Sequence, residues 1–223
     1  MQPATRNLCG IAMLAGVLML ADVPPVRAQT ATPTRDEIIE KLNKFESAPE
    51  FDIPALRHQT MERSKVRSKT DPPPNKRPLI APDLTKLPTI NLDIQFDVDT
   101  PIVQPASYQT LGRIADALVH SSMQPYGVLI VGHTESNGRR ENNVILSQRR
   151  ADAIRDMLVN TFKIATKRVQ SVGLGEEQFI DQARPTSPVN NQIQVVTLMK
   201  MPEPEPAKPA DAAKKQQPAK KKK

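Results

Sequence analysis

The chain has 223 residues, which is enough for one folded domain with appended segments or for two small domains. Only 3% of the residues are aromatic, none is Trp and 22 are Pro, so much of the chain is expected to build no hydrophobic core. The net charge of +7 comes from the ends: residues 91–200 hold 11 Lys/Arg and 11 Asp/Glu, whereas residues 201–223 hold seven Lys and three acidic residues. This distribution argues against nucleic-acid binding, which requires a basic stripe with aromatic side chains on a folded surface.

Residues 1–28 have the pattern of a secretory signal peptide. Arg6 supplies a positive charge, residues 8–21 form an apolar run, and residues 26–28 resemble a cleavage site. The apolar run is shorter than the roughly 20 residues needed to cross a bilayer. This favours cleavage and export, and an uncleaved membrane anchor remains the alternative. Cys9 is the only cysteine, and because it precedes the main part of the apolar run, no lipid anchor is expected.

Residues 29–89 are predicted to hold a short helix followed by a Pro-rich linker. Thr34 and Glu37 have the spacing of a capping box, and the apolar residues after them indicate an amphipathic helix that docks on the main domain or binds a partner. Residues 54–68 are a candidate for a second, highly charged helix. Six Pro between residues 70 and 89 favour an extended spacer without regular structure.

Residues 90–199 alternate between strand-like and helix-like patterns. Strands are expected at residues 90–98, 128–131, 169–174 and 192–199, and helices at about 105–118 and 143–162. This β-α-β-α-β-β order predicts an α/β sandwich in which the helices pack on one face of a mixed four-stranded sheet. The Lys-rich tail, residues 200–223, is predicted to be disordered and to attract anionic polymers or lipid headgroups.

The most informative stretch runs from the second expected strand, through a polar loop, into the second expected helix. Apolar residues recur four positions apart along this helix, and Arg150 falls on the same stripe. The apolar members are Leu146, Ile154 and Leu158. A guanidinium in such a place needs an anionic partner or a ligand, because an unpaired buried charge is very costly. Glu135, at the other end of the loop, is the candidate partner, and a purely structural ion pair is the alternative.

Signals for catalysis or metal binding are weak. The three histidines, His58, His120 and His133, do not have the spacing of a zinc site. Ser147 falls in the first turns of the expected helix, where capping or polar exposure explains it better than a nucleophilic role. We therefore expect no enzymatic activity, no cofactor and no metal.

Several linked motifs occur in the order and spacing of a known family. They are Phe96-Asp97-Val98-Asp99, Leu111-x-x-Ile114-Ala115, Gly132-His133-Thr134-Glu135, Asn143, Leu146-Ser147-x-Arg149-Arg150-Ala151 and Val172-Gly173-Leu174-Gly175-Glu176. Together they make residues 90–199 resemble the OmpA-like C-terminal domain, a peptidoglycan-binding domain. The resemblance implies an OmpA-like fold and non-covalent peptidoglycan binding in the cell envelope of a Gram-negative bacterium. It also implies a location in the periplasm, associated with the outer membrane or the cell wall.

The resemblance also implies a ligand-binding site. In the family, an Asp that follows the Thr and an Arg fifteen residues later bind the diaminopimelate residue of the stem peptide, and the matching residues here are Glu135 and Arg150. The candidate ligand-binding residues are Thr134, Glu135, Asn143, Leu146, Arg150 and Gln192.

The chain departs from the family pattern in two ways that bear on this site. Glu135 replaces the usual Asp, and Asn191-Gln192 replaces two arginines. These departures leave an alternative open, in which the protein is an envelope scaffold with weak or no wall binding. In that case the N-terminal helix and the Lys-rich tail would recruit other envelope proteins.

Overall fold

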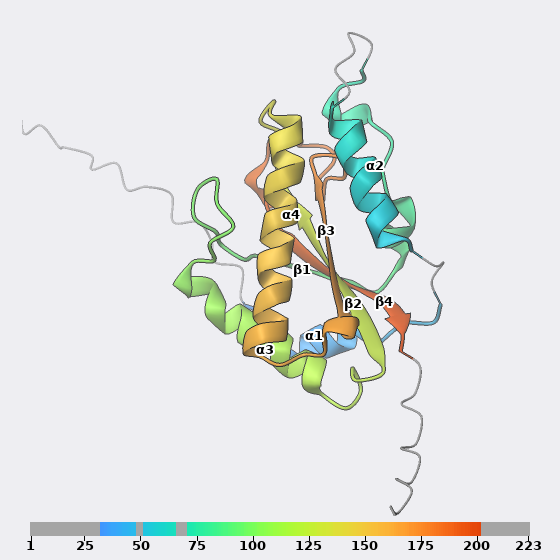
Figure 1. The fold of residues 1–223 in the computed structure, drawn as a ribbon, viewed down its shortest axis with the longest axis vertical. Coiled ribbons are helices and arrows are strands. Elements are labelled where there is room, and N and C mark those ends of the chain that lie inside the picture. Colours follow the sequence, from blue (N-terminus) through green and yellow to red (C-terminus); the bar gives the residue numbers. More distant parts are fainter. Residues whose placement is uncertain (1–31, 48–50, 66–70, 202–223) are drawn as a thin grey trace, which may run out of the picture. The chain divides into compact units, whose positions relative to one another are not determined.

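A mixed four-stranded sheet lies at the centre of the region that the computed structural model describes, residues 32–47, 51–65 and 71–201 (Figure 1). The strands are β1 (Thr89–Leu92), β2 (Tyr126–His133), β3 (Val169–Gly175) and β4 (Ile193–Lys200). Their order in the sheet is β1-β4-β2-β3. β2 and β3 are parallel, whereas β4 is antiparallel to both β1 and β2. The predicted α/β class with a mixed four-stranded sheet is therefore confirmed.

Three α-helices cover one face of this sheet. They are α1 (Arg35–Leu42), α3 (Tyr108–Val119) and α4 (Arg140–Asp156), which continues into a π-helical turn (Met157–Thr161). In α3, Leu111, Ile114 and Leu118 recur at helical spacing and are fully buried, as the sequence predicted. α1 begins with the predicted capping box, in which Thr34 and Glu37 exchange side-chain-to-backbone hydrogen bonds, and it packs against α3.

Helix α4 approaches β2 and β3 unusually closely because glycines lie beneath it. A Cβ atom added at Gly132 would overlap the backbone of Ser147, and one added at Gly173 would overlap the backbone of Gln148. The missing side chains let the helix backbone rest on the carboxyl-terminal ends of the two parallel strands. This contact fixes where α4 begins relative to the loop that leaves β2.

The second face of the sheet is covered by the N-terminal part of the chain, which the sequence did not predict. Helix α2 (Ile53–Lys65) and the 3₁₀ helix Pro82–Lys86 place apolar side chains on β2, β3 and β4. The buried apolar side chains from this part are Ile53, Leu56, Ile80, Ala81, Leu84 and Leu87. The extended spacer expected at residues 70–89 is therefore not what the structure places there. The cause lies in β2, whose apolar side chains point to both faces, so that both faces need a cover.

The expected first strand, residues 90–98, ends earlier than predicted. β1 stops at Leu92, and the chain then folds back in a hairpin in which Phe96 pairs with Val103. Asp99 at its tip has φ 54°, and Val98 is 88% exposed. Apolar residues continue to alternate with polar ones beyond Leu92, and for this reason the predicted strand was too long. The turn at residues 97–100 forms one wall of the candidate site.

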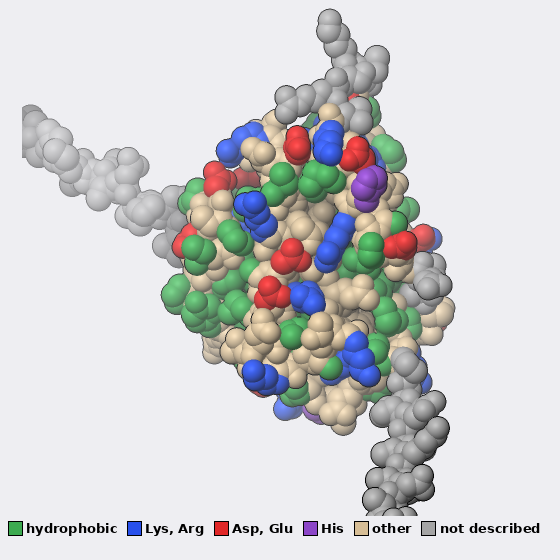
Figure 2. All heavy atoms as spheres, viewed as in Figure 1, with side chains coloured by type: hydrophobic (Ala, Val, Ile, Leu, Met, Phe, Trp, Pro, Cys, Tyr) green, Lys and Arg blue, Asp and Glu red, His purple; other side chains and the backbone are tan. Residues whose placement is uncertain are grey.

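The remaining short 3₁₀ helices are Pro74–Lys76, Pro105–Ser107, Thr166–Arg168 and Pro188–Asn190. Within the described ranges, no helix is both long and apolar enough to span a membrane. Positive and negative side chains are interspersed on the face seen in Figure 2. The expected signal peptide (1–28) and nearly all of the Lys-rich tail (200–223) lie outside the described residues.

Candidate functional site

The loop between β2 and α4 is held in place by hydrogen bonds from its first residues. The backbone N–H of Thr134 donates to the carbonyl of Gly175 (3.0 Å), which ties the loop to the end of β3. The backbone N–H of Glu135 donates to Oδ1 of Asn191 (3.0 Å), which ties it to the segment before β4. The backbone of both candidate residues is thus fixed by strand ends on either side.

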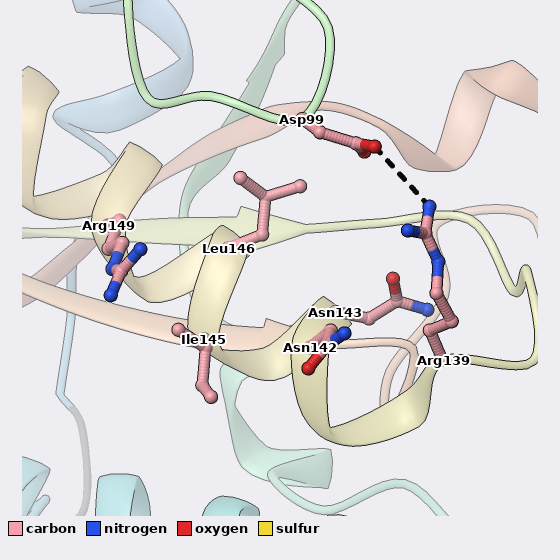
Figure 3. A pocket seen from close by; sticks show the side chains of 7 residues that line it. All are labelled: Asp99, Arg139, Asn142, Asn143, Ile145, Leu146 and Arg149. Carbon is pink, nitrogen blue, oxygen red and sulfur yellow. Dashed lines mark hydrogen bonds and ion pairs between the residues drawn. The ribbon is translucent and has the colours of Figure 1, made fainter.

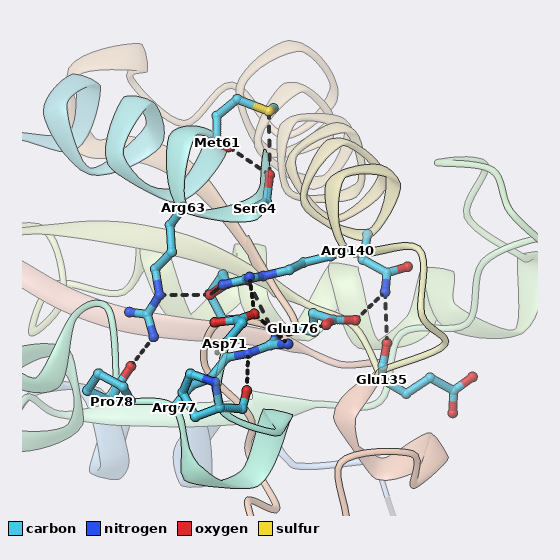
Figure 4. A network of polar contacts seen from close by, with 12 residues as sticks. Met61, Arg63, Ser64, Asp71, Arg77, Pro78, Glu135, Arg140 and Glu176 are labelled. Carbon is cyan, nitrogen blue, oxygen red and sulfur yellow. Dashed lines mark hydrogen bonds and ion pairs between the residues drawn. The ribbon is translucent and has the colours of Figure 1, made fainter. Parts of the chain in front are cut away.

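Asn143 is the buried polar residue on which the loop and α4 meet. Its side-chain amide donates to the carbonyl of Glu135 (3.3 Å) and to Oε2 of Glu176 (2.8 Å). These bonds use the backbone of Glu135 and leave its carboxylate available. Figure 4 shows that this carboxylate points away from Glu176 and the ionic contacts around it.

Arg150 does not pair with Glu135, contrary to the expectation from the sequence. Its Nε donates to the carbonyl of Thr100 (3.1 Å), and its guanidinium carbon lies 4.8 Å from the centre of the Phe96 ring. Among the described residues, no hydrogen bond or ion pair reaches its two terminal nitrogens. Burial lowers the pKa of Arg150, and the negative charge of Asp99 opposes this shift. Because the guanidinium group is a very strong base, it stays charged at neutral pH.

The reason for this difference lies in the hairpin at residues 96–103. The helical stripe that contains Arg150 faces the Phe96 ring as well as the core, and an arginine can stack on an aromatic ring while remaining charged. Arg150 therefore satisfies its apolar surroundings without a carboxylate partner.

A cleft of about 320 Å³ lies between the turn at residues 97–100 and the first half of α4 (Figure 3). It is lined by Asp99, Arg139, Asn142, Asn143, Ile145, Leu146 and Arg149. Asp99 and Arg139 face each other across it at 3.4 Å. Both side chains are more than half exposed, and exposed pairs of this kind contribute only ~0–1 kcal/mol. A charged ligand can therefore displace this pair at low cost.

The structure brings some of the predicted site residues together and separates others. Asn143, Leu146 and Arg150 share one side of α4, because residues three and four positions apart lie on the same face of a helix. Asn143 and Leu146 line the cleft, and Arg150 binds the carbonyl next to Asp99. Thr134, Glu135, Gln192 and Arg150 itself lie outside the lining, and the carbonyl of Gln192 accepts a hydrogen bond from the backbone of His133.

Sequence reasoning missed five of the residues that line the cleft. These are Asp99, Arg139, Asn142, Ile145 and Arg149. Asp99 directly follows the strand expected at residues 90–98, whereas β1 ends at Leu92 and Asp99 lies at the tip of a hairpin. The consecutive pair Arg149-Arg150 was a usable signal, because two adjacent residues on a helix point in different directions and only one of them can face the core.

The polar residues considered for catalysis have structural roles. His133 is buried, and its Nδ1 lies 2.8 Å from the carbonyl of Gln178. Burial lowers the pKa of His133, which favours the neutral ring. Ser147 donates to the carbonyl of Val144 and accepts from the backbone N–H of Gly175, each at 2.9 Å. In the part of the chain that the structure describes, no cluster of three His, Cys, Asp or Glu side chains is placed to hold a metal ion.

Curated relatives match one part of the chain. Outer membrane porin F of Pseudomonas aeruginosa is 35% identical over 97 residues, which covers 44% of this chain and 27% of porin F. The peptidoglycan-associated lipoprotein of Brucella melitensis is 35% identical over 92 residues, which covers 40% of this chain and 53% of the lipoprotein. The chain thus spans about a quarter of the porin and about half of the lipoprotein.

Solved structures match a similar share of the chain. The cell wall anchor of the T6SS from Pseudomonas aeruginosa is 26% identical, covers 50% of this chain and 80% of its own, and has a TM-score of 0.40. The peptidoglycan-associated lipoprotein from Burkholderia pseudomallei is 26% identical, covers 52% of this chain and 94% of its own, and has a TM-score of 0.38.

A family model described as the OmpA family matches residues 95–192. This range contains the hairpin, the loop after β2, the cleft and all six ligand-binding candidates. Residues 95–192 are therefore the part of this chain that is similar to the OmpA family.

Proposed function

We propose that this protein binds peptidoglycan non-covalently, through the diaminopimelate residue of the stem peptide, in the envelope of a Gram-negative bacterium. The observation that carries the proposal is the state of Arg150. Its guanidinium is charged, partly buried and oriented by Phe96 and Thr100, yet among the described residues no side chain neutralises its terminal nitrogens. An oriented cation of this kind is suited to an anionic ligand.

The chemistry of diaminopimelate fits the groups on this side of α4. One carbon of diaminopimelate carries both an ammonium and a carboxylate, so a receptor needs a bidentate donor and an acceptor close together. The two terminal nitrogens of Arg150 can bind the carboxylate through parallel hydrogen bonds. The carboxylate of Glu135 can accept from the ammonium, while Asn143 holds the Glu135 backbone. Leu146 offers an apolar surface to the methylene chain.

Two further candidates border this arrangement. Thr134 precedes Glu135 in the loop, and its buried hydroxyl has no hydrogen-bond partner among the described residues. Gln192, at the position of a family arginine, adds neutral polar contact in place of a positive charge. We therefore expect the binding affinity to depend more on Arg150 and Glu135 than on Thr134 or Gln192.

The expected affinity of one site is modest. Each hydrogen bond to a charged group contributes ~1.5–3 kcal/mol net, which places a single stem peptide on the order of micromolar affinity. A polymeric wall raises retention because many sites are presented together. The proposal assigns binding to this site and no catalytic step.

The names of the relatives support a location at the cell envelope. One is an outer membrane porin and the other is a peptidoglycan-associated lipoprotein. We place this protein in the periplasm, associated with the wall or the outer membrane. The Lys-rich tail would add attraction to anionic envelope polymers.

Co-sedimentation of the full chain with purified sacculi tests the proposal. The wild-type protein should sediment with the sacculi, and Arg150→Gln and Glu135→Gln should reduce the sedimented fraction. Arg155→Gln is the matched control, because Arg155 lies on α4 but donates to the Val169 carbonyl and pairs with Asp156. Equal sedimentation of all four proteins would contradict the assigned site. If the wild-type protein stays in solution, the scaffold alternative is favoured instead.

A further inference from the structure

We infer that the N-terminal part of the chain controls wall binding, because Arg77 positions Asn143 through Glu176. We call residues 51–65 and 71–88 the N-terminal clasp. The inference rests on the proposed function and deepens it, since it concerns the regulation of the same site.

The clasp is joined to the OmpA-like part of the chain by a compact network of charged side chains (Figure 4). Its members are Arg63, Asp71, Arg77, Arg140, Glu176 and Glu177. Arg63 comes from α2, Asp71 and Arg77 from the segment before β1, Arg140 from the first turn of α4, and the two glutamates from the end of β3. The network therefore connects four parts of the chain.

Glu176 and Glu177 need the positive side chains that the clasp supplies. The side chains of Glu176 and Glu177 are 2% and 0% exposed, and buried carboxylates require positive partners. Oε2 of Glu177 accepts a hydrogen bond from Nη2 of Arg140 on α4 (2.7 Å). The same oxygen forms an ion pair with Nε of Arg63 in the clasp (2.9 Å). Oε1 of Glu176 forms an ion pair with Nη1 of Arg77 (3.0 Å), which also belongs to the clasp.

Arg77 is held by other residues of the clasp, so the position of its guanidinium depends on whether the clasp is docked. Its Nε donates to the carbonyl of Pro72 (3.2 Å) and its Nη2 pairs with Asp71 (3.4 Å). Asp71 in turn accepts from Arg140 at 2.8 Å. A shift of the segment that carries Pro72 and Asp71 therefore moves the Arg77 guanidinium away from Glu176.

Glu176 connects Arg77 to Asn143, which lines the cleft. Its Oε1 accepts from Arg77, and its Oε2 accepts from the side-chain amide of Asn143 at 2.8 Å. The same amide group donates to the carbonyl of Glu135, and Asn143 lines the cleft. Without Arg77, the Glu176 carboxylate must take up a proton or move toward another cation. Either change alters the hydrogen bond that orients Asn143.

The position of Arg77 in the sequence makes the coupling a property of this chain. The match to the OmpA family begins at residue 95, so Arg77 lies outside it. Because coupling between two sites is reciprocal, the ligand should also stabilise the docked clasp.

A double-mutant cycle on the full chain tests the inference, with a soluble diaminopimelate-containing muropeptide as the probe. Arg77→Gln should weaken binding about fivefold, which corresponds to a coupling of ordinary size between neighbouring groups. In the Asn143→Ala background the same change should weaken binding by less than about twofold, because the residue through which Arg77 acts is gone. Arg63→Gln is the control, since it removes a clasp arginine that contacts Glu177 and the Pro78 carbonyl instead.

A second measurement does not depend on ligand binding. In the free protein, Arg77→Gln should shift the NMR resonances of the Asn143 side-chain amide, and Arg63→Gln should leave them nearly unchanged. If Arg77→Gln prevents folding, Arg77→Lys replaces it, and that variant should bind at an affinity between those of the wild type and Asn143→Ala.

The outcomes separate the two proposals. A wild-type chain that does not bind the muropeptide contradicts the proposed function, while the amide resonances still test the inference. A wild type that binds, together with equal losses for Arg77→Gln in both backgrounds and no shift of the Asn143 amide, overturns the inference.

Discussion

The guanidinium carbon of Arg150 lies 4.8 Å from the centre of the Phe96 ring, so an arginine of α4 stacks on an aromatic residue of the hairpin after β1. The contact joins two elements on either side of the cleft. It holds a charged group in a partly apolar place, and the two terminal nitrogens of Arg150 have no hydrogen-bond partner among the described residues. The hairpin therefore contributes to the candidate site as well as connecting β1 to α3.

Phe96→Leu is expected to weaken ligand binding because it removes the aromatic face under Arg150. A cation–π contact of this kind is worth about 0.5–2 kcal/mol, so affinity for the muropeptide should fall by about two- to thirtyfold. Isothermal titration calorimetry measures the change. Phe45→Leu is the control: Phe45 stacks edge-on against Tyr126 at 6.0 Å, a contact that does not involve α4. That variant should lose stability and keep its affinity.

The contact between α4 and the sheet gives a prediction about stability. Gly173→Ala should destabilise the protein by about 1–3 kcal/mol or more, since the added Cβ atom would overlap the backbone of Gln148 and force α4 away from β3. Gly112→Ala in α3 is the matched control, because a Cβ atom there meets no other atom within 4 Å. Removing a helical glycine should stabilise by up to about 1 kcal/mol. Urea denaturation of both variants compares these effects, and equal stabilities would contradict the close approach.

Burial of His133 predicts a pH dependence of stability. The pKa of the folded-state imidazole is lowered, mainly by burial, below its ordinary value of about 6.5. Between these two pKa values the unfolded chain binds a proton that the folded chain does not. The contribution to stability is therefore complete above pH of about 6.5 and is lost as the pH falls toward the folded pKa, by at most ~1.4 kcal/mol per pH unit.

Urea denaturation between pH 7.5 and 5 checks this effect by comparing the wild type with His133→Asn, since an amide can still donate to the Gln178 carbonyl. The advantage of the wild type over the variant should shrink as the pH falls. His120→Asn, at an exposed position, serves as the control. A constant difference between the wild type and His133→Asn across this range would contradict the prediction.

The elements that position the site could be read from local sequence patterns. β2 is a run of buried apolar residues and α3 has a regular apolar stripe, so both were predicted, and Gly173 and Gly175 correctly indicated the end of β3. Each of these patterns depends on neighbours within a few positions of the chain. That is why the sheet, its helices and the loop that carries Glu135 were expected in the right places.

The partners of the charged residues could not be read in the same way. Arg150 was paired with Glu135 because both face the same loop, whereas its contacts are Phe96 and the Thr100 carbonyl. Those contacts exist because the chain turns back at Asp99, where the alternation of apolar residues gave no sign of a turn. Arg77 was likewise assigned to a spacer, because its Pro-rich surroundings conceal the apolar residues that dock it on the sheet.

The central claim is that Arg150 recognises the carboxylate, and Glu135 the ammonium, that diaminopimelate carries on one carbon. Calorimetric titration of the full chain with two muropeptides tests it most directly, one with diaminopimelate and one with lysine at the same position of the stem. Lysine keeps the ammonium and lacks the carboxylate that Arg150 binds. The account predicts micromolar binding of the diaminopimelate peptide, binding at least about tenfold weaker for the lysine peptide, and loss of this preference in Arg150→Gln. Equal affinity of the wild-type chain for both peptides would contradict it.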